Sequence, residues 1–183
     1  MGAWRNVEIL PPRAFRCGYC GRDVGSKEGY HEGDTSLGQP IVYICQHCDR
    51  PTFFQDETQS PGPIPGRAIE HLPDDVQALY EESRRSASAG AFTASVMACR
   101  KILMHIAVDK GADHNQSFLH YVDYLSSNGY ITPDGKKWVD HIRSKGNDAN
   151  HEIALMTRPD AERLLLFTDM LLRLVYEFPA SLP

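Results

Sequence analysis

Four cysteines in two pairs are the residues of this chain best suited to chemistry. The pairs occur as CGYC, with Cys17 and Cys20, and as CQHC, with Cys45 and Cys48. Two residues between cysteines suit a tight turn that directs both thiolates toward one metal ion. Four thiolates around Zn²⁺ leave no coordination position for water, so the spacing predicts a structural zinc site.

Two other interpretations of these cysteines remain open. They could form disulfide bonds or act as reactive thiols, and His31 or His47 could replace one ligand. The paired spacing favours metal binding in a reducing compartment. Residues 41–44, IVYI, read as a strand leading into the second pair. We therefore expect a small β-rich zinc ribbon over residues 1–55, which needs its metal in order to fold.

Aromatic residues within the expected ribbon have two interpretations. They could stack on nucleic-acid bases, or they could form the ribbon's own small core. The core interpretation is favoured. The residues concerned are Tyr19, Tyr30, Tyr43, Phe53 and Phe54.

The remainder of the chain reads as a linker followed by helices. Residues 56–72 alternate proline and glycine and predict an extended linker. From residue 73 to residue 183, apolar stripes bounded by glycine and proline predict about five helices. We therefore expect a mainly α fold, a five-helix bundle preceded by the zinc ribbon. The expected helices lie near residues 73–89, 91–110, 117–128, 133–146 and 159–178.

The last expected helix carries more apolar side chains than one stripe requires. Leu164, Phe167, Leu171, Leu174 and Phe178 are expected to line one side. Further apolar residues widen the surface beyond that side, so the helix needs either central burial or a partner subunit. The fifth cysteine, Cys99, lies in the apolar stripe of the second helix and is expected to be buried.

A second polar cluster lies in the segment HIRSKGNDANHEI, residues 141–153. Arg143 offers a planar fork for phosphate, Asn147 offers a donor and an acceptor, and His151 can exchange protons near neutral pH. These groups suit gripping or cleaving a phosphodiester. They also suit a structural role, with Asn147 in a left-handed turn after Gly146 and His151 bonded to a backbone carbonyl.

Three stretches resemble a known family: GAFTASVMACRKIL at 90–103, IRSKGNDANH at 142–151 and PDAERLLLFTDMLLRLVYEFP at 159–179. They resemble the all-helical HEPN superfamily and, within it, the domain of unknown function family 4145, which often carries an N-terminal zinc ribbon. The resemblance implies that residues 73–183 form a HEPN-like helical domain and pair into a homodimer.

The same resemblance implies a metal-independent ribonuclease site. Arg143 and His151 would be its motif residues with Asn147 as a polar companion, and Arg100 and Lys145 would contact RNA or phosphate. Seven residues separate Arg143 from His151, whereas the family motif has four to six.

Composition limits the functions that fit. The chain has 19 basic and 24 acidic residues and a net charge of −5, so no global positive field attracts nucleic acid, and any such role must be local. No apolar run approaches the roughly 20 residues that cross a bilayer, and no secretion signal is visible. We expect a cytoplasmic protein without membrane contact.

Three hypotheses for function follow. The first is a protein that binds or acts on RNA or a nucleotide, as a ribonuclease in a defence or toxin-like system. The second is a non-catalytic module that binds a protein partner or a nucleic acid. The third is a structural subunit of a larger assembly.

Overall fold

The computed structural model describes residues 4–33, 39–132, 134–137, 139 and 155–182. The chain divides into two compact units. The sheet unit comprises Met1–Ile64 and Ser88–Gly90, and the helical unit comprises Pro65–Ala87 and Ala91–Pro183. The linker expected at residues 56–72 contains a short strand and, from Pro65 onward, residues of the helical unit.

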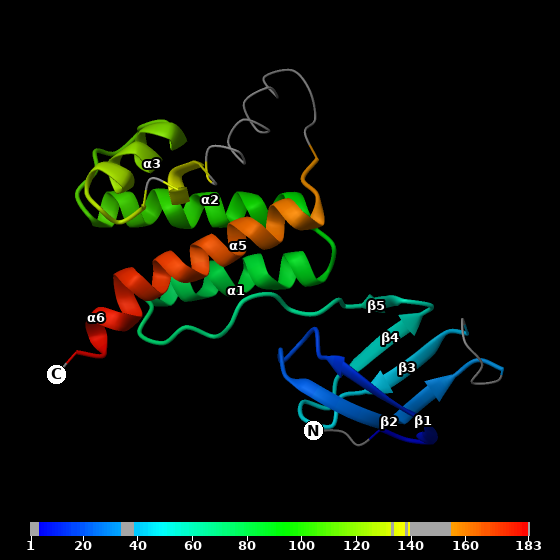
Figure 1. Cartoon of the computed structure of the whole chain (residues 1–183). Helices are drawn as coiled ribbons and strands as arrows, with labels where there is room; N and C mark the ends of the chain where they lie inside the picture. Colours follow the sequence, from blue (N-terminus) through cyan, green and yellow to red (C-terminus); the bar gives the residue numbers. More distant parts are fainter. Residues whose placement is uncertain (1–3, 34–38, 133, 138, 140–154, 183) are drawn as a thin grey trace. The chain divides into compact units, whose positions relative to one another are not determined.

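The sheet unit is built on one antiparallel sheet whose strands follow chain order (Figure 1). Each strand is hydrogen-bonded to the next, so the sheet is a meander of consecutive hairpins. Its strands are β1 (Glu8–Arg16), β2 (Asp23–His31), β3 (Ile41–Ile44), β4 (Pro51–Gln55) and β5 (Thr58–Ser60).

Side-chain alternation gives the sheet one buried face. Tyr43 and Phe54 are each only 3% exposed, whereas the neighbouring Phe53 points away and is 37% exposed. This alternation follows from the two-residue period of a strand. The core of the sheet unit is small: Leu10, Phe15, Cys17, Ile41, Tyr43, Cys45 and Phe54.

The helical unit contains three helices that end at glycines. Gly90, Gly111 and Gly129 have positive φ angles, a conformation that stops a helix and suits glycine. Each lies two residues after the last residue of its helix, so the expected stop signals are confirmed at these three positions. The helices are α1 (Asp74–Ser88), α2 (Phe92–Asp109) and α3 (Phe118–Ser127).

The C-terminal part of the helical unit is one continuous run of helix. It consists of α5 (Arg158–Leu172), the π-helix η2 (Arg173–Glu177) and the short α6 (Phe178–Ala180). Thr157 and Asp160 form a capping box at its start. α2 contacts both α3 and α5, and Ile102, Leu103 and Ile106 of α2 are fully buried in the resulting core.

The expectation of a mainly α fold with a five-helix bundle is wrong. The fold is mixed: of the described residues 45% are helical and 19% lie in strands, and a five-stranded antiparallel sheet stands beside the helices. Only β3 has an obvious strand sequence. β1 contains Pro11 and Pro12 and β2 contains Gly25 and Gly29, residues that weaken a strand when it is read in isolation. Pairing with neighbouring strands stabilises them, and that pairing is a long-range effect.

The face of the last helix also differs from the expected one. Leu164, Phe167 and Leu171 are buried as expected, but Leu174 is 48% exposed and Phe178 is 53% exposed. Leu174 lies four residues after Met170, which is exposed as well, and Phe178 lies beyond the π-helix at residues 173–177. A π-helix turn takes more residues than an α turn, so side chains beyond it rotate off the face that an α-helical period predicts.

The fourth expected helix is only partly described. Residues 134–137 and 139 are helical, and the rest of the expected range 133–146 lies outside the described residues. Among the helices that are described, none has the length and apolar character needed to cross a membrane. The cytoplasmic location stays a prediction.

Candidate metal centre

The order of the strands brings the two cysteine pairs to the same end of the sheet. Cys17 and Cys20 lie in the turn between β1 and β2, and Cys45 and Cys48 lie in the turn between β3 and β4. Successive turns of a meander alternate between the two ends of a sheet, so the first and third turns share one end. Cysteines far apart in sequence therefore meet.

The two cysteine turns have the same hydrogen-bond pattern. In the first turn, the N–H of Cys17 donates to the carbonyl of Arg22 (2.9 Å) and the N–H of Gly21 donates to the carbonyl of Cys17 (3.0 Å). In the second turn, the equivalent bonds join Cys45 to Arg50 (3.0 Å) and Asp49 to Cys45 (2.9 Å). The two turns therefore have the same loop conformation, and each carries one cysteine pair.

The residue after each cysteine pair adopts a left-handed conformation. Gly21 has φ +69° and its counterpart Asp49 has φ +56°. Glycine adopts this conformation without strain, and Asp tolerates it better than most residues. The sequences CGYCGR and CQHCDR thus repeat a pattern whose fifth residue must turn the chain back into the next strand.

The sulfur atoms are spaced as ligands of one tetrahedral metal ion would be. All four ligand atoms lie within 4.8 Å of one another. The Sγ atoms of Cys17 and Cys48 are 3.8 Å apart, and those of Cys20 and Cys45 are 3.9 Å apart. A tetrahedron with Zn–S bonds of about 2.3 Å places its sulfurs about 3.8 Å apart. A disulfide would place them about 2.05 Å apart. The four cysteines are free and could hold one metal ion.

The electrostatics of the site suit a divalent cation. Burial and the neighbouring sulfurs raise the pKa of Cys17, and the same causes raise the pKa of Cys48 to about 12. A dication surrounded by these sulfurs would favour their thiolate forms, because each thiolate would then face an opposite charge. The N–H of Tyr19 also points at the Sγ of Cys17 (3.4 Å), which favours negative charge on that sulfur.

Contacts outside the ligand set hold both turns in place. The Arg50 guanidinium lies over the Tyr19 ring, with 5.1 Å from Cζ to the ring centroid, and so joins the second turn to the first. Trp4 Nε1 donates to the carbonyl of Asp49 (2.8 Å), which ties the N-terminal segment to the second turn. The Arg16 Nε donates to the carbonyl of Gly21 (3.0 Å).

The two histidines considered as ligands are not part of the described cluster. Its members are the four cysteines alone. His31 instead lies 3.0 Å from the carboxylate of Glu8, and His47 is exposed. Cys99 is buried in the helical unit beside the Ser83 hydroxyl (3.0 Å), and burial raises its pKa to about 11. Its expected burial is confirmed.

The aromatic residues of the sheet unit divide between its core and its surface. Tyr43 and Phe54 are buried against Phe15, so the core interpretation is confirmed for them. Tyr19 and Phe53 are exposed, and Tyr30 is half-buried next to Trp4.

The second predicted site is described at one residue only. Arg143, Lys145, Asn147 and His151 all lie outside the described residues. Arg100 lies on α2, half-buried, with its guanidinium Cζ 4.4 Å from the centroid of the Phe118 ring. Burial lowers the pKa of Arg100. The described parts of the chain place no carboxylate in an ion pair with it.

Sequence reasoning identified the four clustered cysteines but missed the residues that hold their turns in place. Arg50 and Asp49 repeat the positions of Arg22 and Gly21, and the repeated pattern was visible in the sequence. Trp4 gave no such signal, because its bond to Asp49 joins residues 45 positions apart.

Comparison with known proteins gives one match. Residues 81–182, more than half of the chain, match the family described as Domain of unknown function (DUF4145). No match was found among curated proteins or among solved structures.

Proposed function

The chain belongs to the DUF4145 family, and from this premise we propose that it is a zinc-containing protein that binds RNA or a nucleotide through its helical unit. The sulfur spacing is the observation that carries the zinc part of the proposal. Four cysteine ligands fill the coordination sphere, so the ion holds the sheet unit together and activates no water. The family match covers most of the helical unit, where we place the ligand.

The zinc proposal is tested by metal content. Full-length protein purified without added metal should contain one zinc per chain by elemental analysis. Cys20→Ser should lose that stoichiometry, because three thiolates and a hydroxyl bind zinc far more weakly. Cys99→Ala is the matched control and should retain the metal, since Cys99 lies in the helical unit. Wild-type protein without bound transition metal would overturn the proposal.

Arg100 supports an anionic ligand for the helical unit. Its charge is partly removed from water, and stacking on Phe118 fixes the plane of its guanidinium. A fixed guanidinium suits phosphate, which it can bind through two parallel hydrogen bonds. Lys145 would add a second cation. The overall charge of −5 restricts the contact to a local patch.

The binding proposal is tested with a fluorescent single-stranded RNA and with ATP at low and moderate salt. Arg100→Gln should weaken binding about tenfold, the loss expected for one charge-assisted pair. Arg85→Gln is the control, because Arg85 is an exposed arginine on α1. Equal losses in the two variants, or wild-type protein without affinity at low salt, would reject the site.

Membership of the HEPN superfamily and ribonuclease activity extend this proposal. His151 would act as general acid or base, Arg143 would stabilise charge on the phosphate and Asn147 would orient the substrate. His151→Ala should then abolish RNA cleavage while RNA binding persists, whereas His114→Ala should leave cleavage unchanged. Intact RNA after incubation with the wild-type protein across neutral pH would leave a non-catalytic binding module.

A homodimer through the helical unit is supported by an exposed apolar stripe. Leu166, Met170, Leu174 and Phe178 follow one another at four-residue spacing and are 45% to 59% exposed. A second copy could cover this stripe by an isologous contact. Light scattering should give a dimer for the wild type and a monomer for Leu174→Glu. Met97→Glu is the control, because Met97 is equally exposed but lies on α2.

A further inference from the structure

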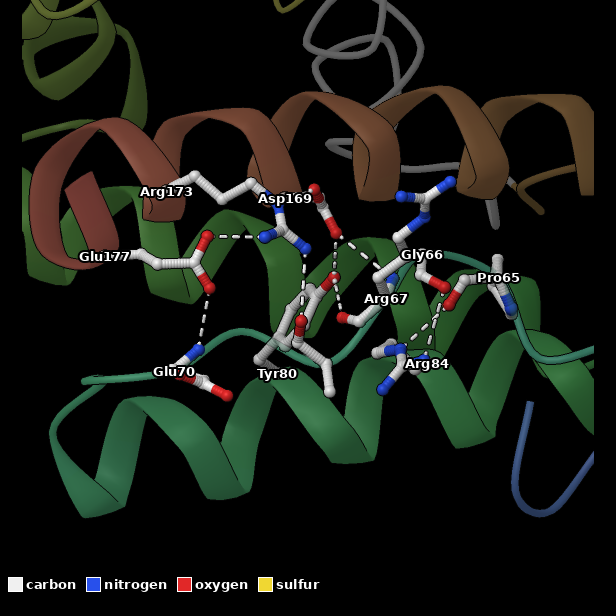
Figure 2. Close-up of polar contacts among 10 residues, drawn as sticks. Pro65, Gly66, Arg67, Glu70, Tyr80, Arg84, Asp169, Arg173 and Glu177 are labelled. Carbon is white, nitrogen blue, oxygen red and sulfur yellow. Dashed lines mark hydrogen bonds and ion pairs between the residues drawn. The ribbon is translucent and has the colours of Figure 1, made fainter. Parts of the chain in front are cut away.

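Residues 65–70, here named the strap, cross α1 and α5 without forming regular secondary structure (Figure 2). Side chains of the two helices and of η2 hold the strap by its main-chain atoms. The Arg84 Nε donates to the carbonyl of Pro65 (2.8 Å), and the Arg84 Nη2 donates to that of Gly66 (3.3 Å). The first part of the strap is therefore held by α1.

The second half of the strap is held from α5 and η2. The N–H of Arg67 donates to Asp169 Oδ1 (3.2 Å), and the N–H of Glu70 donates to Glu177 Oε1 (2.9 Å). Between them, Arg173 Nη2 donates to the carbonyl of Ala68 (3.1 Å). Figure 2 shows these bonds side by side. The helices thus offer alternating acceptors and donors to a polypeptide backbone, the kind of recognition seen where domains bind peptides.

The side chains that hold the strap also hold one another. Arg173 bonds Asp169 through Nε (2.8 Å) and Glu177 through Nη1 (2.5 Å), and the Tyr80 hydroxyl donates to Asp169 Oδ1 (2.7 Å). Asp169, Arg173 and Glu177 are four residues apart on one helical run, so their ion pairs do not depend on a segment lying across them. The hydrogen bond with Asp169 raises the pKa of Arg173, which keeps that side chain charged.

Two features of the strap decide which segments could take its place on α1, α5 and η2. Gly66 has φ +69°, and a Cβ at this position would lie 2.7 Å from the Tyr80 hydroxyl, so a side chain is excluded there. Ile69, three residues later, is 4% exposed and packs in the core of the helical unit. Arg67, Ala68 and Glu70 are exposed. These helices therefore bind main-chain atoms of the strap. They also require a glycine, then two residues of any type, then an apolar residue.

We propose that α1, α5 and η2 form a peptide-binding groove, and that the strap is its intramolecular occupant, which a partner protein's segment with the pattern Gly-x-x-Ile displaces. Ile69 is the one buried side chain of the strap, while Pro65 is half-buried and Arg67, Ala68 and Glu70 are exposed. Opening the strap should therefore require much less free energy than unfolding the helical unit. The closed strap lowers the apparent affinity for an external segment by the fraction of molecules in which the groove is free.

The test uses full-length protein and a fluorescein-labelled peptide, PGRAIEHL, which copies residues 65–72. Ile69→Asp should release the strap and raise peptide affinity about 10- to 100-fold over wild type, the factor that corresponds to burying one Ile side chain. A peptide with alanine in place of its glycine should bind neither protein. Adding Arg173→Gln to Ile69→Asp should remove the binding again. Circular dichroism should show that both variants keep their helices.

If Ile69→Asp fails to fold, amide hydrogen exchange of the wild type tests independently whether the strap opens locally. The Arg67 and Glu70 amides should exchange through a local opening, at least tenfold faster than the buried α5 amide of Leu171. Strap amides as protected as Leu171 would overturn the proposal, because the strap would then be a permanent part of the core. A folded, strap-released variant without peptide affinity would overturn it as well.

Discussion

Substitution of Gly21 by alanine should weaken metal binding without touching a ligand. Gly21 adopts φ +69°, and a residue with a Cβ pays about 1–2 kcal/mol in this conformation. The turn around Cys17 and Cys20 needs this conformation, because the Gly21 N–H bonds the Cys17 carbonyl. Zinc affinity should therefore fall about 5- to 30-fold, as measured by competition with a chromogenic chelator at pH 7.

Two further substitutions make this prediction specific to the turn. Gly25→Ala adds the same methyl group in β2, where the new Cβ meets nothing within 4 Å and φ is not positive, so zinc affinity should change less than twofold. Asp49→Gly removes a Cβ at the equivalent position of the second turn and should keep or slightly improve affinity. Wild-type affinity in Gly21→Ala, or an equal loss in Gly25→Ala, would refute the reasoning.

Three further predictions concern the two units. Removing zinc with excess chelator should unfold the sheet unit, whose apolar core is small, while amides around Ile102 in α2 stay protected from hydrogen exchange. Leu103→Ala should lower the free energy of unfolding in urea by about 2–5 kcal/mol, because Leu103 is fully buried, whereas Met97→Ala on the same helix should change it by less than about 0.5 kcal/mol. Burial opposes ionisation of Asp169, but hydrogen bonds from Arg173, Tyr80 and the Arg67 N–H outweigh it and lower its pKa below the ordinary carboxyl range. The resulting stabilisation is fully present above the unfolded-state pKa, about 3.9 for Asp, and is lost as the pH falls through the folded-state pKa. Urea midpoints at pH 6 and pH 3 should therefore differ less in Asp169→Asn than in the wild type.

Signals within a few residues were readable from the sequence. The two CxxC pairs identified the four cysteines that could hold a metal ion, and Gly90, Gly111 and Gly129 marked where three helices end. Both kinds of signal are local, because a turn or a helix stop depends on the backbone conformation of a few consecutive residues.

Pairing between distant residues was not readable in this way. The extent of the sheet was missed because β1 and β2 contain proline and glycine, and their stability comes from neighbouring strands. The strap was read as part of a linker because its Pro and Gly content indicates only an absence of helix. Its bonds to Asp169 and Glu177 cross more than 100 positions of sequence.

The sequence by itself determined which four sulfur atoms could hold a metal ion and, through Gly90, Gly111 and Gly129, where three helices end. Only the tertiary structure decided that the two cysteine turns share one end of a sheet, and that the last helix presents Leu174 and Phe178 to solvent. The spacing of cysteines and glycines within a few residues determines the geometry of a single turn. What packs against a strand, the strap or a helix face depends on how the whole chain folds.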